Sequence, residues 1–512
     1  MKWIAKIGHS PFLFVLFIAI TRIPFLFFGY GSEEDAWALP LVAERIATTG
    51  VYEVSRLPGH PFQELFYACI WNTGPVIYNL ITLLISSIGL YFFIKLLQLK
   101  NLEWKWATLS LAFTPIFYIN CTNNMDYVWA CSFIIVSLYF LFRERFILSG
   151  LLLAFAIGCR ITSGAALLPM ILYLIADHRK GYIKNAFQLC FGAGLFTLLI
   201  FIPVFKEYGL SFFTYYEHFP IPSFAKNFYK GSIGAFGITG YVAVFFLMIY
   251  SIKKLIHNPS LFKSPLFVLS IVGISIFKVA FISLPLKSAF IIPILPYLFL
   301  FTAFIANEKY QRWTAISLVV SCFFFGINLS DPLRGSKESA ASFTFEVNKQ
   351  KVAFDVFSGI FTADITKRIN RTHFAEKVLQ QVQGIHQPTY IIAGWYLSDL
   401  LVLQRNKENK LVEFGYYTAE AKLDSLAKKN IDLRYLPQQD ELNDLRFNFE
   451  KTFQINLEYF WVHMIEYEHQ GYQNLHDHSN NEDFSFILYL NSCDTGNTTF
   501  IRSEEHTSEL QS

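Results

Sequence analysis

The sequence predicts an α-helical polytopic membrane protein with about eleven transmembrane helices and a C-terminal extracytoplasmic α/β domain. Three observations lead to this fold class. Hydrophobic residues make up 53% of the 512 residues, with 55 Phe, and the mean hydropathy of +0.36 exceeds that of most soluble chains of this length. Apolar runs recur through residues 1–330. From about residue 331 charged residues mix with apolar ones, which indicates a separate soluble domain.

The first run follows a basic start with Lys2 and Lys6, as in a signal peptide, but no small-residue cleavage site follows. We therefore expect a retained first span. A helix needs roughly 20 apolar residues to cross the hydrocarbon core. This rule predicts spans at 11–29, 75–94, 106–119, 127–142, 146–158, 162–176, 186–204, 240–252, 264–283, 288–306 and 313–328.

The basic residues predict the orientation. If the N-terminus is cytoplasmic, the loops on one side hold most of the Lys and Arg residues, which marks that side as the cytoplasm. The other side receives the loops at 31–74 and 205–239 and the turns at 120–126, Arg160 and Lys287. An odd number of spans places the C-terminal region outside.

The loop at 31–74 opens with three consecutive carboxylates, Glu33, Glu34 and Asp35, where the first span leaves the hydrocarbon. Carboxylates there are costly unless they have a function or a counter-charge. We therefore expect this loop to carry the function. The alternative for Asp35 is a helix N-cap, because SEED precedes an Ala- and Leu-rich helix.

The C-terminal part, residues 331–501, follows the linker DPLRGSKES and alternates between strand and helix patterns. Strands are predicted at 388–396, 410–417 and 431–436, and helices at 397–404 and 419–430. The polar run with His469, His476, Asp477 and His478 is typical of a solvated loop rather than a metal site. Residues 502–512, RSEEHTSELQS, resemble a translated sequencing adapter, and we expect them to be an assembly artefact. The seven cysteines show no paired spacing that would indicate disulfides or zinc.

The predicted topology brings polar residues from distant parts of the chain to the outer face. They are Asp35, Asp126, Arg160 and Lys287, with Tyr215, Tyr216, Glu217 and His218 from the second long outer loop. Carboxylates can remove a proton from a hydroxyl or hold a divalent ion, and Arg and Lys can neutralise a phosphate. A membrane-embedded phosphate that carries a sugar would use both kinds of group.

The stretch EDAWALPLVAERIATTGVY, followed by RLPGHPFQE, resembles the first outer loop of the GT-C glycosyltransferases, the group that includes protein mannosyltransferases and aminoarabinose transferases. Residues 125–169 and 286–303 are similar to its middle and late spans, so the resemblance covers roughly residues 11–306. It places Asp35 on the leading acidic residue. Ala36 stands where a second acid is common, and Glu34 can take its place from the other side.

This resemblance implies an inverting glycosyltransferase of a bacterial inner (plasma) membrane. Its donor would be a polyprenyl-phosphate sugar and its acceptor a hydroxyl of a glycan, lipid or protein, and no nucleic acid partner is indicated. Asp35 would accept the proton of the acceptor, assisted by Glu34, while Arg160 and Lys287 stabilise the departing phosphate. The carboxylates permit a divalent cation, Mg²⁺ or Mn²⁺, without requiring one.

Each further site residue has a structural alternative. Arg160 can snorkel from a helix end, Lys287 can anchor at the interface, and Asp126 can terminate a turn. His60 and Glu64 can bind acceptor or metal, or only form part of an extended turn.

Two more basic residues, Arg22 and Lys278, fall inside predicted spans. A charge there costs about 2.5 to 3.5 kcal/mol at the centre of a helix. Either the span boundaries differ from those predicted, or these two side chains face a polar cavity.

Two other function classes stay open. A transporter, flippase or ligase of lipid-linked glycans should show paired inverted halves with broken helices, and the sequence has no such repeat. A non-catalytic membrane sensor with an outer domain would tolerate replacement of Asp35.

Overall fold

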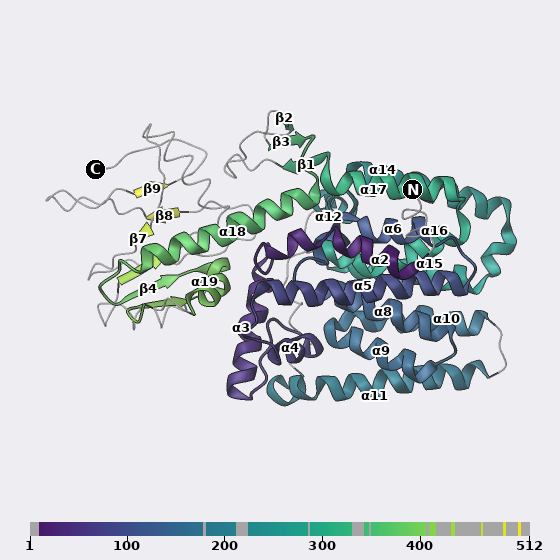
Figure 1. Cartoon of the computed structure of the whole chain (residues 1–512), viewed down its shortest axis with the longest axis horizontal. Helices are drawn as coiled ribbons and strands as arrows, with labels where there is room; N and C mark the ends of the chain where they lie inside the picture. The colour runs from purple at the N-terminus through teal and green to yellow at the C-terminus, as the bar shows by residue number, and fades with distance from the viewer. Residues whose placement is uncertain are drawn as a thin grey trace. The chain divides into compact units, whose positions relative to one another are not determined.

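A computed structural model describes residues 10–177, 181–210, 224–284, 287–329, 342–347, 350–405 and 409–415, and the short segments 432–435, 462–463, 485–487 and 500–502. The chain forms two compact units (Figure 1). The first comprises residues 1–330 and 337–372, and the second comprises 331–336 and 373–512. Residues 337–372, which the sequence analysis assigned to the outer domain, thus pack with the helical unit.

The first unit is built from helices. Their order is α2 Pro11–Ile20, η1 Ile23–Phe27, α3 Glu34–Thr49, α4 Pro61–Ala68, α5 Pro75–Leu99, α6 Lys105–Phe113, α7 Pro115–Asn120, α8 Asp126–Phe142, α9 Phe146–Cys159, η2 Ile161–Ala166, α10 Leu167–Ala176, α11 Tyr182–Tyr208, α12 Phe224–Gly231, α13 Ile233–Phe236, α14 Ile238–His257, η4 Pro259–Lys263, α15 Pro265–Ser283, η5 Ser288–Ile294, α16 Leu295–Ile305 and α17 Glu308–Phe323.

Helices α5, α8, α9 and α11 pack side by side in this order, and α14 packs on α17 (Figure 1). The contact between α9 and α11 depends on small residues. A β-carbon on Gly150 would lie 2.4 Å from the backbone oxygen of Leu189, and Gly192 faces the backbone of α9 in the same way. Such small residues let apolar helices approach closely where no hydrophobic effect drives them together.

Within the described residues, five helices are long and apolar enough to cross a membrane: α5, α11, α14, α15 and the continuous segment Ser288–Ile305. Four shorter apolar helices of 10 to 17 residues are Pro11–Ile20, Asp126–Phe142, Phe146–Cys159 and Ile161–Ala176. The number of about eleven spans stays a prediction.

Several predicted spans are interrupted. The span at 106–119 is wrong as one helix, because Pro115 lacks a backbone N–H and separates α6 from α7. The span at 11–29 consists of α2 followed by the short 3₁₀-helix η1, which starts next to Pro24. The span at 313–328 is shifted, since α17 runs from Glu308 to Phe323 and strand β1 follows. An apolar run such as FFFGI has the same composition in a helix end and in a buried strand.

The first unit also holds an antiparallel sheet of β1 Gly326–Leu329, β2 Ser342–Val347 and β3 Gln350–Asp355, in the order β1–β3–β2. The long helix α18, Ile360–Val382, follows this sheet. Its residues up to Thr372 belong to the first unit, so α18 can contribute side chains to the helical part.

In the second unit, strand β4 Thr389–Ile392 pairs in parallel with β5 Val412–Gly415 and with β6 Asp432–Tyr435, and β7 Val462–His463 is antiparallel to β6. Helix α19, Leu397–Gln404, packs on this sheet through a core that includes Ile391, Leu400 and Phe414. Strands β8 Ser485–Ile487 and β9 Phe500–Arg502 pair with each other.

Strands β4, β5 and β6 and helix α19 lie within the ranges that the sequence predicted. Some predictions fall outside the described residues, so the complete α/β domain stays a prediction. They are the helix at 419–430, residues 503–512, the cluster His469, His476, Asp477 and His478, and the loop with Tyr215, Tyr216, Glu217 and His218.

Candidate active site

Asp35 is held by two cations. It is the second residue of α3, and Glu33 rather than Asp35 occupies the N-cap position. The Lys287 ammonium donates to Asp35 Oδ2 at 2.6 Å, and Arg56 Nη1 lies 2.6 Å from the same oxygen. The Asp35 side chain is 25% exposed. The carboxylate is therefore part of an ion network and does not serve as the helix cap.

Asp126 lies deeper in the same network. It is the first residue of α8, and its side chain is 2% exposed. Arg160 Nη1 donates to Asp126 Oδ2 at 2.9 Å, and Arg56 Nη2 donates to Oδ1. The Arg160 guanidinium also lies over the rings of Tyr127 and Phe290, at 4.5 and 4.3 Å from their centroids. Arg56 thus bridges the two aspartates, and Arg160 supports Asp126.

Glu33 completes the network, because its carboxylate accepts a hydrogen bond from Lys287 at 2.6 Å. Carboxylates and cations alternate along the chain of contacts, so three negative charges face three positive ones. Its order is Glu33, Lys287, Asp35, Arg56, Asp126 and Arg160. The structure thus brings together Asp35, Asp126, Arg160 and Lys287, the four residues that the sequence placed on one face.

The neighbouring charges shift the pKa values of Asp35 and Lys287. Burial alone would raise the pKa of Asp35, but the charges of Arg56 and Lys287 outweigh it and hold that pKa well below its usual range. Burial alone would lower the pKa of Lys287, but Glu33 and Asp35 outweigh it and raise that pKa. Asp35 is therefore ionised at neutral pH, and it is a weak base while both cations hold it.

Glu64 is bound by donors of its own loop, which favours the structural alternative given for it above. Its buried carboxylate accepts hydrogen bonds from the Tyr52 hydroxyl at 2.5 Å, from the Ser55 backbone and hydroxyl at 2.7 Å each, and from the His60 backbone at 3.0 Å. Four protein donors thus occupy its two oxygens. Glu64 folds the loop that presents Arg56, and we assign it to positioning rather than to ligand binding.

His60 is also inside the protein. Its Nδ1 lies 2.5 Å from the backbone oxygen of Cys159 and 3.8 Å from Asp126 Oδ2. A carbonyl can only accept, so Nδ1 carries the proton. Burial lowers the pKa of His60 and outweighs the opposing charge of Asp126, so the imidazole is neutral at pH 7. Among the described residues, its Nε2 has no hydrogen-bond partner.

Two partners in this network were not predicted from the sequence. Arg56 was part of the quoted RLPGHPFQE motif but was not singled out, and Glu33, rather than Glu34, supplies the second carboxylate on Lys287. Glu34 is the half-buried first residue of α3. Three carboxylates in a row and a cation in the same loop signal a network, but they do not reveal which carboxylate meets which cation.

Helix α18 contributes a clamp, formed by Asp364 and Arg368, that was not predicted from the sequence. Arg368 is fully buried, and it donates to Asp364 Oδ2 at 2.7 Å and to the backbone oxygens of Thr122 and Ile119 at 2.7 and 3.0 Å. The Ser32 hydroxyl donates to the other oxygen of Asp364 at 2.6 Å. This clamp joins the segment before Asp126 to the segment before Glu33. Only the weak i, i+4 spacing of Asp364 and Arg368 could have indicated it.

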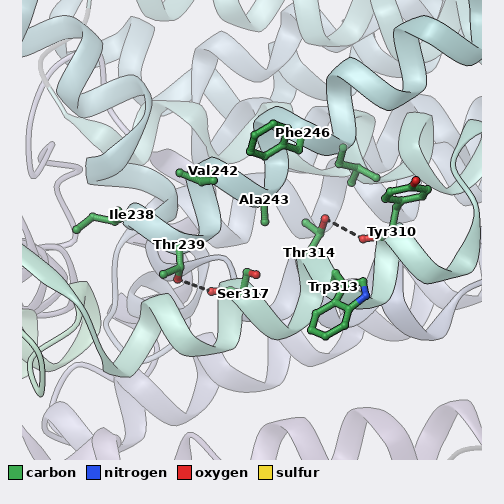
Figure 2. A pocket seen from close by; sticks show the side chains of 10 residues that line it. Ile238, Thr239, Val242, Ala243, Phe246, Tyr310, Trp313, Thr314 and Ser317 are labelled. Atoms are coloured by element: carbon green, nitrogen blue, oxygen red, sulfur yellow. Dashed lines mark hydrogen bonds between the residues drawn. The ribbon is translucent and has the colours of Figure 1, made fainter.

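A polar cavity of about 260 Å³ borders the network. Its lining includes Ser32, Glu33, Asn123, Lys230, Lys287 and Asp364. A larger cavity of about 480 Å³ lies between α14 and α17, where Val242, Phe246 and Trp313 line it (Figure 2). Within the described part of the chain, no charged side chain lines this second cavity. Its Thr239 and Thr314 hydroxyls donate to backbone oxygens at 3.0 Å each. We therefore take the smaller cavity as the candidate active site.

A metal ion is not indicated by this arrangement. Among the described residues, no group of three or more His, Cys, Asp or Glu side chains is placed to hold one. Glu33, Asp35 and Asp126 each face a cation of the protein, which a metal would have to displace. A Mg²⁺ or Mn²⁺ ion stays a prediction, and we derive no step through it.

The fold is similar to that of ArnT from Cupriavidus metallidurans, an aminoarabinose transferase of the GT-C group. The apo structure matches with a TM-score of 0.50 and 13% identity over 88% of this chain and 95% of that chain. The structure bound to undecaprenyl phosphate matches with a TM-score of 0.51 and 14% identity over 86% of this chain and 94% of that chain. No family model and no curated protein matches the sequence. The predicted resemblance is confirmed at the level of the fold, which is mostly helical with several apolar helices, and the chain is a multi-pass membrane protein.

Proposed function

We propose that this protein is an inverting glycosyltransferase that moves a sugar from a polyprenyl-phosphate carrier to an acceptor hydroxyl. The observation that carries the proposal is the Asp35 carboxylate, which is shared by Arg56 and by Lys287, a residue that lines the polar cavity. The likeness to a fold that binds undecaprenyl phosphate in ArnT supports a lipid phosphate as the donor. The acceptor is a glycan, a lipid or a protein.

Donor binding would change the charges around Asp35. A phosphate is a stronger partner for Lys and Arg than a single carboxylate, because it offers more charged oxygens. When Lys287 turns towards the donor phosphate, Asp35 loses part of the field that lowers its pKa. The carboxylate then becomes a better base at the moment when the donor is in place.

The transfer step follows from these positions. The acceptor oxygen attacks the anomeric carbon, its proton passes to Asp35, and the bond between the anomeric carbon and the phosphate oxygen breaks. The phosphate leaves with the bonding electrons and its lipid, and Lys287 stabilises the charge. Asp126 keeps Arg56 in place, and Arg160 stabilises Asp126 from the other side. In this proposal Arg160 acts through Asp126, whereas the family resemblance implies that it contacts the phosphate directly.

The reaction is proposed to take place at the outer face of a bacterial inner membrane, with the N-terminus in the cytoplasm and the C-terminal domain outside. The one-sided distribution of Lys and Arg supports this orientation. A lipid-linked donor made on the cytoplasmic side needs no nucleotide-sugar site in this chain.

The direct test is transfer of labelled sugar by the purified full-length protein from a panel of polyprenyl-phosphate sugars. We expect one donor to release polyprenyl phosphate in step with labelling of the acceptor. Absence of both release and transfer from every donor would contradict the enzyme. If the same protein then moved lipid-linked glycans across proteoliposomes, the transporter alternative would replace it.

The shifted pKa values predict the pH dependence of kcat/KM, which reports the free enzyme. Asp35 must be ionised to accept a proton, and its pKa lies below the usual range, so no acid limb from Asp35 is expected between about pH 6 and 9. His60 is neutral at pH 7 and above, and Lys287 is charged throughout this window. Lys287→Met removes one of the cations that lower the pKa of Asp35. That pKa should rise, and the acid limb should move to higher pH.

Initial rates at limiting donor, measured between about pH 4 and pH 9, check this prediction. Arg45→Gln is the control, because Arg45 forms an exposed ion pair with Glu53 in the same outer loop. It should keep the wild-type profile. An acid limb at the same pH in wild type and Lys287→Met would show that Lys287 does not set the pKa of the base.

A further inference from the structure

Lys278 is a cation on the side of a helix that is long and apolar enough to span a membrane. It lies five residues before the end of α15, about 7.5 Å along the axis at 1.5 Å per residue, and its side chain is exposed. Its neighbours Val279 and Ile282 are 62% and 57% exposed, as expected for a lipid-facing surface. Among the described residues, no carboxylate forms an ion pair with Lys278, and its ammonium lies 5.1 Å from the Phe281 ring centroid.

The Lys278 ammonium lies against α12. A β-carbon on Gly231 would be 3.2 Å from Lys278 Nζ and 2.9 Å from the Phe281 ring, so the absence of a side chain at Gly231 leaves room for the ammonium. The preceding residue, Lys230, lines the polar cavity together with Lys287. Lys278, Lys230 and Lys287 thus lie in this order between the lipid-facing surface of α15 and Asp35, with Lys230 on α12.

We propose that Lys278 and Lys230 bind the phosphate of a membrane lipid at the bilayer side of the cavity and pass it to Lys287. This inference rests on the proposed function, since it supplies the entry route for the donor. An exposed cation without a carboxylate partner attracts an anionic headgroup, while the lipid chain stays beside the apolar surface of α15. The step is binding only, and no bond is formed or broken.

A simpler role for Lys278 is interfacial anchoring, in which the side chain snorkels to the headgroup region. An anchor contributes to insertion and does not change the affinity for one lipid. Binding therefore separates the two roles.

The test measures binding of a fluorescent polyprenyl phosphate to the full-length protein in nanodiscs of phosphatidylcholine. Lys278→Met should slow association and raise Kd about fivefold, the effect of one cation near the membrane surface. Lys278→Arg should restore most of the affinity. Lys253→Met, at an exposed lysine of α14, should bind as wild type does. At saturating donor, Lys278→Met should turn over at the wild-type rate, because the change affects KM and leaves kcat unchanged.

Competition with phosphatidylglycerol identifies the source of the phosphate. If phosphatidylglycerol displaces the polyprenyl phosphate from wild type and displaces it less from Lys278→Met, the site also binds phospholipid headgroups. If phosphatidylglycerol displaces none of it, the site binds the polyprenyl phosphate alone. Unchanged association rate and Kd in Lys278→Met would overturn the entry route while the proposed function stands. If wild-type protein bound no polyprenyl phosphate, both would fail.

Discussion

Asp35→Asn is expected to lower kcat for sugar transfer by about 10²- to 10⁴-fold, the range that general-base catalysis contributes. Asparagine has nearly the same shape as aspartate but cannot accept the proton of the acceptor hydroxyl. Donor binding should be retained or become tighter, because the substitution removes the carboxylate that competes with the donor phosphate for Lys287 and Arg56. A loss of kcat without a loss of affinity would identify Asp35 as the base.

The measurement is turnover at saturating donor, together with the Kd for polyprenyl phosphate. Glu53→Gln is the matched control, since it removes a carboxylate of the same loop from an exposed ion pair with Arg45. It should change neither quantity by more than about twofold, as expected for surface pairs. Wild-type turnover in Asp35→Asn would exclude the base role and would favour a sensor, in which Asp35 tolerates replacement.

The sequence predicted the membrane class because composition and run length decide it, but it did not predict how the helices are broken. Hydropathy is an average over a window of residues. A helix, by contrast, ends where a backbone N–H is missing or where another segment takes over the hydrogen bonds of the backbone. At Pro115 the run of apolar residues continues while the helix stops. At Phe324 the chain leaves α17, and β1 pairs with β3.

In the candidate active site, the sequence identified Asp35, Asp126, Arg160 and Lys287, because charged residues at the ends of apolar runs are conspicuous. It could not identify their partners. Arg56 contacts Asp126 across 70 residues of sequence, and Lys287 contacts Asp35 across 252. Pairing at such separations depends on how helices pack, and the motif around Arg56 gives no signal of it. The contacts of Arg368 with Thr122 and Ile119 could not be predicted for the same reason.

The second large effect is on stability. Asp126→Asn is expected to destabilise the protein by about 3 to 5 kcal/mol, the cost of removing one partner from a buried ion pair. Arg56 and Arg160 both donate to this carboxylate, and the side chain is 2% exposed. Without the Asp126 charge, the buried Arg160 guanidinium would lose the carboxylate that it pairs with. Neutral His60 cannot replace the lost charge.

Thermal unfolding of the purified protein in detergent checks this, with Arg160→Gln and the double variant completing a cycle. Asp126→Asn combined with Arg160→Gln should lose less stability than the sum of the single changes, because removing both charges leaves fewer buried cations unpaired. Additive losses would mean that the two side chains do not interact. The stability measurement also distinguishes the role of Asp35 from that of Asp126. Asp35→Asn should lose chemistry in a folded protein, since Asp35 is 25% exposed and its partner Lys287 lines the cavity. Asp126→Asn should instead lose the fold that holds Arg56 on Asp35.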